Sequence, residues 1–427
     1  MRKSLGALVL AGFMVSCLGI SPSYAGEIDI LLEKLVEKGV VSAGESQEIK
    51  TQTQEKIKKE NAQGKNQSLP QWLQTTKFAG DLRIRYQGET KTGSKHRDRG
   101  RFRLRYGFEA RPNELMKVAF KMATGENKTN GPEQTSTNQT FTNTFQNKHV
   151  WVDQAYIEYN PLAQSKLFLL KDMTLTAGKF PNPFYTTDMV WDGDINPEGG
   201  VIKFSPKIAS VEAFLALGFL PIGENSSDSN DPFIYAAQAG VSPNLFKRPS
   251  KFAVALYAYE NIQSVVWNTY SVNYTPTINN TLAGTSLKYD YNILEVNSEY
   301  SPVDLVGGTM PLLLQGTWAS NISKNNGGET KAWMLGFKLG KAKEKGTYDF
   351  FYNFREIGRD AVYAMVNDSD FHLGGTGAKG HKFGGTYAIM PNSTLAVTYF
   401  ITDPYKNIQT GTSKHIDVYQ VDWLTKF

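Results

Sequence analysis

Arginine side chains recur at every second position in two neighbouring stretches of the sequence. The first stretch carries Arg83 and Arg85, and the second runs from Arg97 to Arg105. Because two is the period of a β-strand, each stretch is expected to hold its guanidinium groups on one face. The basic residues that we group together on this pattern are Arg83, Arg85, Arg101, Arg103 and Arg105. Such a face requires water or carboxylates beside it, and it raises the local concentration of small anions.

Acidic residues gather in a later connecting segment, around Trp191. They are Asp188, Asp192, Asp194 and Glu198. If the segment near residues 181–198 folds inward, its carboxylates could stand across a lumen from the arginines and create a transverse field at a constriction. The alternative interpretation is an acidic loop on the surface.

Residue patterns typical of catalysis or metal binding are few. The five histidines lack the helical spacing of a zinc protease, and Cys17 is the only cysteine. Asp368 and Asp370 could bind calcium, but two loop carboxylates are more often hydrated. The Gly-rich stretch from Gly374 to Gly380 lacks the ending of a phosphate loop and is interpreted as a flexible outer loop. We therefore expect no enzyme activity, no cofactor and no metal site.

The first 25 residues are expected to be a secretory signal peptide. Arg2 and Lys3 precede an apolar stretch over 5–20, and Ser23-Tyr24-Ala25 offers a cleavage site, although Cys17 leaves a lipoprotein as an alternative. Cleavage after Ala25 would leave a cysteine-free chain with 44 Lys+Arg against 41 Asp+Glu. This near balance argues against nucleic-acid binding, and stability cannot rest on disulfides.

Residues 26–70 differ from the rest because their apolar residues recur at helical spacing. A first helix is expected to end at Gly39, and Ser42 with Glu45 has the form of a capping box that opens a second helix near Glu45 to Asn61. Ile49 and Ile57 make a thin apolar stripe on that second helix. The segment is interpreted as a periplasmic helical hairpin that could serve oligomerisation, or as a solvated spacer.

From Phe78 onward the pattern changes to period two, and about sixteen strands of ~9 to 14 residues are expected. The clearest lie near 77–89, 99–111, 148–159, 250–262, 329–340, 346–356 and 415–427. The predicted fold class is all-β, a transmembrane antiparallel β-barrel over 71–427, with an even number of strands as a single-chain barrel requires.

The predicted connections alternate in length. Short turns are expected at 111–114, 160–161, 205–206, 242–243, 301–302, around Lys343 and at 391–392, and long polar segments near 90–98, 125–147, 181–196, 223–231, 263–283, 321–328, 357–379 and 403–414. Outer-membrane barrels have tight periplasmic turns and long outer loops. Both chain termini are therefore expected on the periplasmic side of a bacterial outer membrane.

The two faces of the predicted strands indicate which one meets lipid. An arginine facing lipid near the midplane costs ~2 to 4 kcal/mol, so the arginine face is expected to point inward. The opposite face is apolar and aromatic in other strands too, as in residues 333–339 and 348–354. Alone these rows could form the core of a soluble sandwich, but the alternating connections favour contact with outer-membrane lipid.

The last predicted strand ends on an aromatic residue. Tyr419, Trp423 and Phe427 share one face. This arrangement resembles the C-terminal segment that outer-membrane barrel-assembly machinery recognises.

Several motifs resemble those of the bacterial putative-porin family. They are residues 178–184 (GKFPNPF), 191–199 (WDGDINPEG), 360–362 (DAV), 368–371 (DSDF) and the helical start at 31–40. The resemblance implies a water-filled channel for passive diffusion of small hydrophilic solutes and, by analogy with general porins, a homotrimer. Two alternatives stay open: a soluble secreted β-rich protein that binds or hydrolyses carbohydrate, and a substrate-specific outer-membrane channel or receptor.

Overall fold

The computed structural model describes residues 32, 34–38, 40–62, 71–128, 131–132, 134–142, 144–164, 170–208, 211–224, 229–264, 280–305, 310–405 and 414–427. The chain divides into two compact units, Met1–Gln74 and Thr75–Phe427. The expected signal peptide over residues 1–25 lies outside the described residues. Each unit is treated by itself below.

The first unit is helical where it is described. Helix α3 spans Ala43–Ala62, and the short helix α4 spans Gln71–Gln74. The capping box forms as expected, because the Glu45 amide donates to Ser42 Oγ at 3.2 Å and the Ser42 amide donates to Glu45 Oε2 at 2.9 Å. Ile49 is exposed, so the apolar stripe of α3 is uncovered within this chain at that position.

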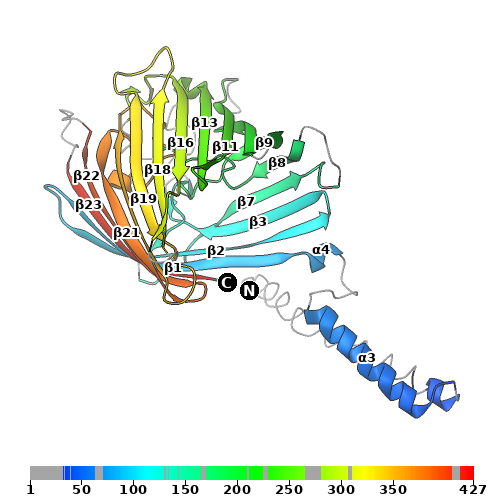
Figure 1. Cartoon of the computed structure of the whole chain (residues 1–427). Helices are drawn as coiled ribbons and strands as arrows, with labels where there is room; N and C mark the ends of the chain where they lie inside the picture. The colour runs from blue at the N-terminus through cyan, green and yellow to red at the C-terminus, as the bar shows by residue number, and fades with distance from the viewer. Residues whose placement is uncertain are drawn as a thin grey trace, which may run out of the picture. The chain divides into compact units, whose positions relative to one another are not determined.

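The second unit is one antiparallel sheet of long strands (Figure 1). Their bounds are β1 Lys77–Lys91, β2 Arg97–Asn113, β3 Met116–Thr124, β7 Val150–Tyr159, β8 Leu170–Lys179, β9 Glu198–Ile208, β10 Val211–Pro221, β11 Phe233–Ser242, β13 Arg248–Glu260, β16 Tyr291–Tyr300, β18 Met310–Asn321, β19 Lys331–Gly340, β20 Tyr348–Ile357, β21 Ala378–Met390, β22 Ser393–Pro404 and β23 Ile416–Lys426. Two-residue pieces such as β6 (Gln139–Thr140) are added to these sixteen strands within the described residues.

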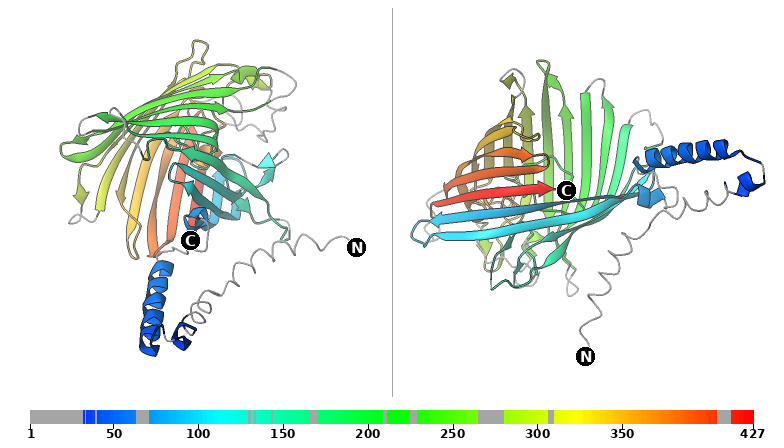
Figure 2. Two further views of the ribbon diagram at one scale, coloured as in Figure 1. Left: turned by 90° about the vertical axis from the view of Figure 1, so that its right-hand side faces the viewer. Right: turned by 90° about the horizontal axis from the view of Figure 1, so that it is seen from below.

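The sheet closes on itself where the first strand meets the last. β1 pairs with β2 on one side and with β23 on the other. The Gly80 amide donates to the Phe427 carbonyl at 2.8 Å, and the Phe427 amide donates back to the Gly80 carbonyl at 3.0 Å. The views in Figure 2 show the resulting closed wall. The predicted all-β antiparallel barrel of sixteen strands is therefore confirmed.

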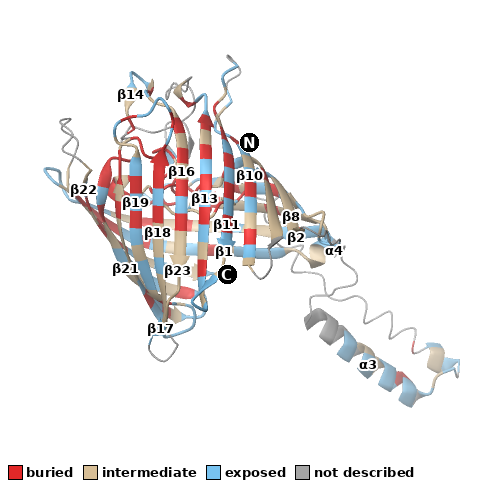
Figure 3. Cartoon of the chain, turned by 45° about the horizontal axis from the view of Figure 1, so that its top comes forward, coloured by how far each residue is buried: buried red, intermediate tan, exposed pale blue. Residues whose placement is uncertain are grey.

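Burial alternates along the strands, as Figure 3 shows. On one face of β1 and β23 the side chains of Ile84, Val421 and Trp423 are exposed, and on the other face Arg85 and Gln87 are buried. The rows over 333–337 and 348–350 likewise have exposed outer side chains, with Phe350 at 51 %. A soluble sandwich would bury these residues, so the outer face of the wall is the apolar one.

The connections alternate in length as expected. At one end of the wall the strands are joined across 114–115, 209–210 and 391–392, and at the other end across 125–149, 180–197, 261–290 and 358–377. The turn expected at Ser205-Pro206 is wrong, because both residues lie within β9 and Pro206 is paired with Leu170. Since β1 begins and β23 ends at the short-turn end, both termini of the barrel lie there.

A core of buried apolar side chains fills part of the barrel interior. Inward side chains of β10–β20, such as Tyr257 and Tyr291, pack against side chains from the connections 180–197 and 358–377. The stretch from Gly374 to Gly380, expected as a flexible outer loop, instead lies against this core, because Thr376 and Ala378 are buried. The Tyr291 hydroxyl of β16 donates to the Asp360 carboxylate at 2.7 Å and fixes the connection 358–377 to the wall. The Thr281 amide donates to the same carboxylate at 2.8 Å and links it to the connection 261–290.

Among the described residues no helix has the length and apolar character that crossing a membrane would require.

The closure of β1 on β23 leads to a first prediction. Replacing Trp423 and Phe427 by Asp should block assembly of the barrel while secretion continues, because both side chains stand on the apolar outer face at the closing seam. The measurement is heat-modifiable gel mobility of membrane fractions, which a closed strand network produces. Phe145→Asp is the control, since Phe145 is fully exposed in a connection. Normal mobility of the double variant would contradict a role of this seam in assembly.

Candidate functional site: a charged constriction inside the barrel

The connection 180–197 folds inward across the barrel. The Tyr185 amide donates to Gln238 Oε1 at 2.7 Å, and Gln238 Nε2 donates to the Tyr185 carbonyl at 2.8 Å. Farther along, Thr186 Oγ1 donates to Glu295 Oε1 at 2.7 Å. Gln238 and Glu295 lie on β11 and β16, so these bonds hold the connection against the inner face of the wall. The segment therefore lies on the inner side of the wall.

The arginines of β1 and β2 share the inner face. The register places Arg83 opposite Arg103 and Arg85 opposite Arg101, and residues directly opposite in an antiparallel pair point to the same side. Each lies beside carboxylates. Arg85 Nε and Asp422 Oδ1 of β23 are 2.7 Å apart.

Arg103 and Arg105 share one carboxylate on the neighbouring strand. Arg103 Nη2 is 2.7 Å from Asp81 Oδ1, and Arg105 Nε is 2.8 Å from Asp81 Oδ2. Pairing of this kind is needed where guanidinium groups leave bulk water, because an unpaired buried charge is costly. The arginine row is therefore a network of ion pairs and not a bare positive wall.

Part of the connection 125–149 lies over this row. β6 continues the sheet along β2, with Thr140 opposite Arg101. Arg83 Nη2 donates to Asn138 Oδ1 at 2.6 Å, and Arg101 Nη2 lies 3.5 Å from Ser136 Oγ. This segment reduces the solvent access of Arg101, which is only 5 % exposed.

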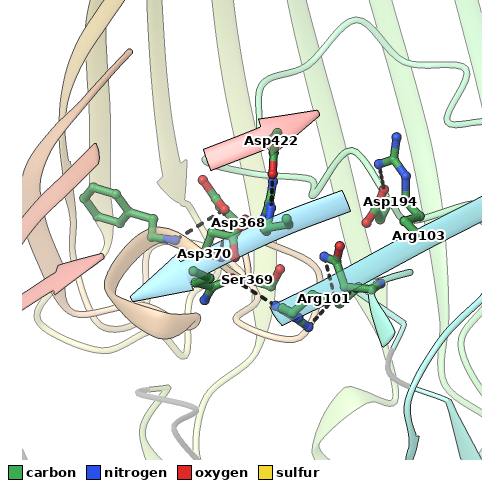
Figure 4. Close-up of polar contacts among 12 residues, drawn as sticks. Arg101, Arg103, Asp194, Asp368, Ser369, Asp370 and Asp422 are labelled. Atoms are coloured by element: carbon green, nitrogen blue, oxygen red, sulfur yellow. Dashed lines mark hydrogen bonds and ion pairs between the residues drawn. The ribbon is translucent and has the colours of Figure 1, made fainter. Parts of the chain in front are cut away.

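The four acidic residues singled out in the sequence have different positions. Asp194 Oδ1 lies 3.5 Å from Arg105 Nη1 and 3.8 Å from Arg103 Nη1, so it is the one that meets the arginine row. Figure 4 shows it beside Arg103. Asp192 accepts a hydrogen bond from the Ser369 amide at 2.9 Å, within the connection 358–377.

The other two acids face different groups. Asp188 lies against Arg355 and Lys382. Glu198 begins β9, has a largely exposed side chain and pairs with Lys179 at 3.1 Å. Glu198 is therefore not brought to the arginines, because strand parity directs it away from the inner face that Val201 occupies.

Arg355 of β20 joins the two inward connections. Its side chain is fully buried, with Nη2 at 3.2 Å from Asp188 Oδ1 and Nη1 at 2.9 Å from Asp368 Oδ2. Lys382 of β21 contacts the same two carboxylates, at 2.5 and 3.5 Å. The Asp368 amide also donates to the Asp188 carbonyl at 2.9 Å. We call Arg355, Lys382, Asp188 and Asp368 the loop latch.

The carboxylates of the connections have shifted pKa values. Burial opposes ionisation of Asp188, but Arg355 and Lys382 outweigh it and lower its pKa. Burial likewise opposes ionisation of Asp370, yet Arg85 and the other nearby groups hold its pKa at about 2. A depressed pKa stabilises the fold above the ordinary pKa of the group and loses that effect only as pH falls through the depressed value. Both carboxylates therefore stay ionised near neutrality.

Asp192 behaves in the opposite way. Burial, followed by the nearby Asp368 and Asp194 carboxylates, raises its pKa well above the ordinary value. Its position between two other carboxylates thus disfavours a third negative charge in the constriction.

Sequence reasoning missed the latch and the second connection. The sequence suggests Asp368 and Asp370 as calcium ligands and as part of a family motif, but not as ion-pair partners. In the structure Asp370 Oδ2 lies 3.2 Å from Arg85 Nη1, and Asp368 pairs with Arg355. Figure 4 shows Asp368, Ser369 and Asp370 together on one side of the constriction. One signal in the sequence was available: Arg355 and Asn353 are two positions apart on β20, so both are expected on the inner face of that strand. Within the described residues no group of three His, Cys, Asp or Glu is placed to hold a metal.

A protein-family model described as "Putative porin" matches residues 38–96, 90–292 and 285–427. These ranges cover most of the sequence, and the barrel fold agrees with a porin. The chain belongs to this family of outer-membrane porins.

Solved structures support the fold. OprB of Pseudomonas putida is 11 % identical, with a TM-score of 0.54 over 83 % of this chain and 94 % of that one. A triple mutant of Rhodopseudomonas blastica porin is 12 % identical, with a TM-score of 0.44 over 82 % of this chain and all of the other. Only the first of these likenesses has a TM-score above 0.5 and bears on the argument. At 11 % identity it concerns the fold alone. No curated protein matches the sequence.

The loop latch generates a second prediction. Replacing Arg355 by Met should release the two connections from each other, because removing one partner of a buried ion pair costs about 3–5 kcal/mol. Single-channel recordings should show a larger and noisier conductance, while heat-modifiable mobility persists because the backbone network of the wall is unchanged.

Arg248→Met is the matched control for this prediction. Its pair with Asp304 is as short, at 2.9 Å, but both groups are exposed, and such pairs contribute ~0 to 1 kcal/mol. Equal conductance changes in the two variants would show that the latch does not hold the constriction.

Proposed function

We propose that this porin conducts small hydrophilic solutes passively across the outer membrane. The observation that carries the proposal is the contrast between the two faces of the wall: apolar side chains outside, and charged side chains around the inward connections inside. A lipid-facing surface and a polar interior are what a diffusion channel requires. The test is stepwise current in a planar bilayer after addition of the purified protein.

The constriction is expected to orient solutes more than to select them by charge. Arg85 and Arg103 stand on one wall with their carboxylate partners Asp422 and Asp81, and Asp194 approaches the same wall from the connection 180–197. Paired charges leave a small net field but a strong local one. Since the Debye length is ~8 Å at physiological salt, this local field acts only where the lumen is narrow.

A substrate-specific channel is the second candidate function. The apolar core favours this candidate, because three long connections contribute buried side chains to the interior, including Trp191 and Tyr363. A lumen filled in this way leaves less room for unselective flow. Saturation of conductance by one class of solute would distinguish it from general diffusion.

The short-turn end of the barrel is proposed to face the periplasm. On this orientation both termini are periplasmic, the segment 26–70 extends there, and the aromatic last strand is presented to the barrel-assembly machinery during insertion. We further propose a homotrimer, by analogy with general porins.

A third prediction concerns ion preference. Replacing Arg101, Arg103 and Arg105 together by Gln should move the reversal potential in a salt gradient toward cation preference, because Asp81 and Asp194 would lose their counter-charges. The reciprocal variant, with Asn at positions 81 and 194, should move it toward anions. A reversal potential unchanged in both would mean that these residues do not line the conducting path.

A fourth prediction concerns the N-terminal segment. A mature chain that begins at Leu69 should insert and conduct, since the pairing of β1 with β2 starts at Lys77 and the closing seam with β23 starts at Gly80. Conductance per barrel and the oligomeric state in detergent are measured together. Normal conductance with a lost oligomer would assign assembly to the segment, and failure to fold would contradict the proposed boundary.

A further inference from the structure

Four lysines on the inner face of the described wall have a carboxylate partner within 4 Å. Lys117 pairs with Glu158 at 2.9 Å, Lys121 with Asp153 at 3.4 Å and Lys338 with Asp349 at 3.1 Å. Lys382 belongs to the loop latch. The charges of these four ammonium groups are therefore neutralised by neighbouring carboxylates.

Lys203 of β9 and Lys251 of β13 differ from these. Each shares the parity of buried inward residues on its strand, Val201 and Ala253 respectively. Neither has a carboxylate oxygen of a described residue within 4 Å. Lys203 Nζ donates instead to the Pro183 carbonyl at 3.1 Å, and Lys251 Nζ lies 3.8 Å from the centre of the Tyr185 ring.

Both ammonium groups are thus held by the first residues of the connection 180–197. This part of the connection is fixed, because Tyr185 exchanges two hydrogen bonds with Gln238 and its carbonyl also accepts one from Asn297 Nδ2 at 3.1 Å. The Phe214 ring, 5.4 Å from Lys251 Nζ, packs over Gly240, where a side chain would collide with it. The two ammonium groups therefore contact a backbone carbonyl and an aromatic ring whose positions are fixed by other residues.

Two carboxylates stand nearby. Glu158 of β7 interacts electrostatically with Lys203, but it already pairs with Lys117 at 2.9 Å. Glu299 is directly opposite Lys251 in the β13–β16 register, but Gln315 Nε2 donates to it at 2.9 Å and the Tyr185 hydroxyl is its neighbour. Since Glu158 is already paired with Lys117, only Glu299 is left beside the two ammonium groups, and a local excess of positive charge remains. That excess lies between the constriction and the short-turn end, because Lys251 is near the start of β13 after the short turn 243–247.

We propose that Lys203 and Lys251 form a binding station for small oxyanions, with carboxylate or phosphate groups, on the wall below the constriction. Ammonium groups are strongly hydrated point charges with three donors each, which suits them to hold oxyanions. The station rests on the proposed channel function and deepens it, since a solute that has passed the inward connection 180–197 would meet it next.

The test uses the whole protein in planar bilayers, with chloride carrying the current and inorganic phosphate or succinate added to either side. Both anions should reduce the chloride current in a saturable way. Replacing both lysines by Gln should raise the half-blocking concentration about tenfold, the equivalent of ~1.4 kcal/mol. Replacing both by Arg should preserve the block. Comparing the two anions distinguishes phosphate from carboxylate as the preferred group.

Lys338→Gln is the matched control, because it removes an inward ammonium group that already has a carboxylate partner. Heat-modifiable mobility of every variant shows that the wall is closed. An undiminished block in the double Gln variant, or an equal loss in the control, would overturn the station. A wild-type protein that conducts without any block would also overturn it and leave the channel proposal intact, whereas a closed barrel without conductance would contradict the channel itself.

Discussion

The rest of the structure depends on the closure of one hydrogen-bonded wall. In a bilayer every backbone N–H and C=O must find a partner within the protein, and a sheet satisfies this only when its last strand meets its first. Here the seam joins residues more than 300 positions apart, from Gly80 to Phe427. Once the wall is closed, side-chain parity decides which residues meet lipid and which meet the lumen, and the arginines of β1 and β2 are fixed on the inside.

Closure also explains why the charges of the lumen are paired. Closure of the sheet places β23 beside β1, so Asp422 contacts Arg85 although the two residues lie at opposite ends of the barrel sequence. The inward connections add Asp194 and Asp370 to the same network. The chemistry of the interior is therefore set by segments that are distant along the chain and neighbours around the ring.

Patterns of neighbouring residues predict the strands and faces of the wall, but they do not predict the contacts of the connections inside it. Strand period, the apolar face of residues 333–337 and the capping box of Ser42 and Glu45 are properties of neighbouring residues, and all agree with the structure. The pairing of Arg355 with Asp188 and Asp368 depends on two connections meeting inside the barrel, which no local period encodes. Glu198 was grouped with the acidic loop by distance along the chain, whereas its strand parity separates it from that loop.

The apolar core inside the barrel has a consequence for the insertion of the protein into the membrane. The stretch 361–365, Ala-Val-Tyr-Ala-Met, is fully or almost fully buried at the tip of the β20–β21 hairpin. If the long connections face the cell exterior, this tip must traverse the bilayer before it docks, and its apolar side chains reduce the cost of that passage. The same stretch, whose Tyr363 ring packs against Tyr259 and Tyr291, thus makes the hairpin easier to translocate. A polar tip would cost more free energy to move across the bilayer.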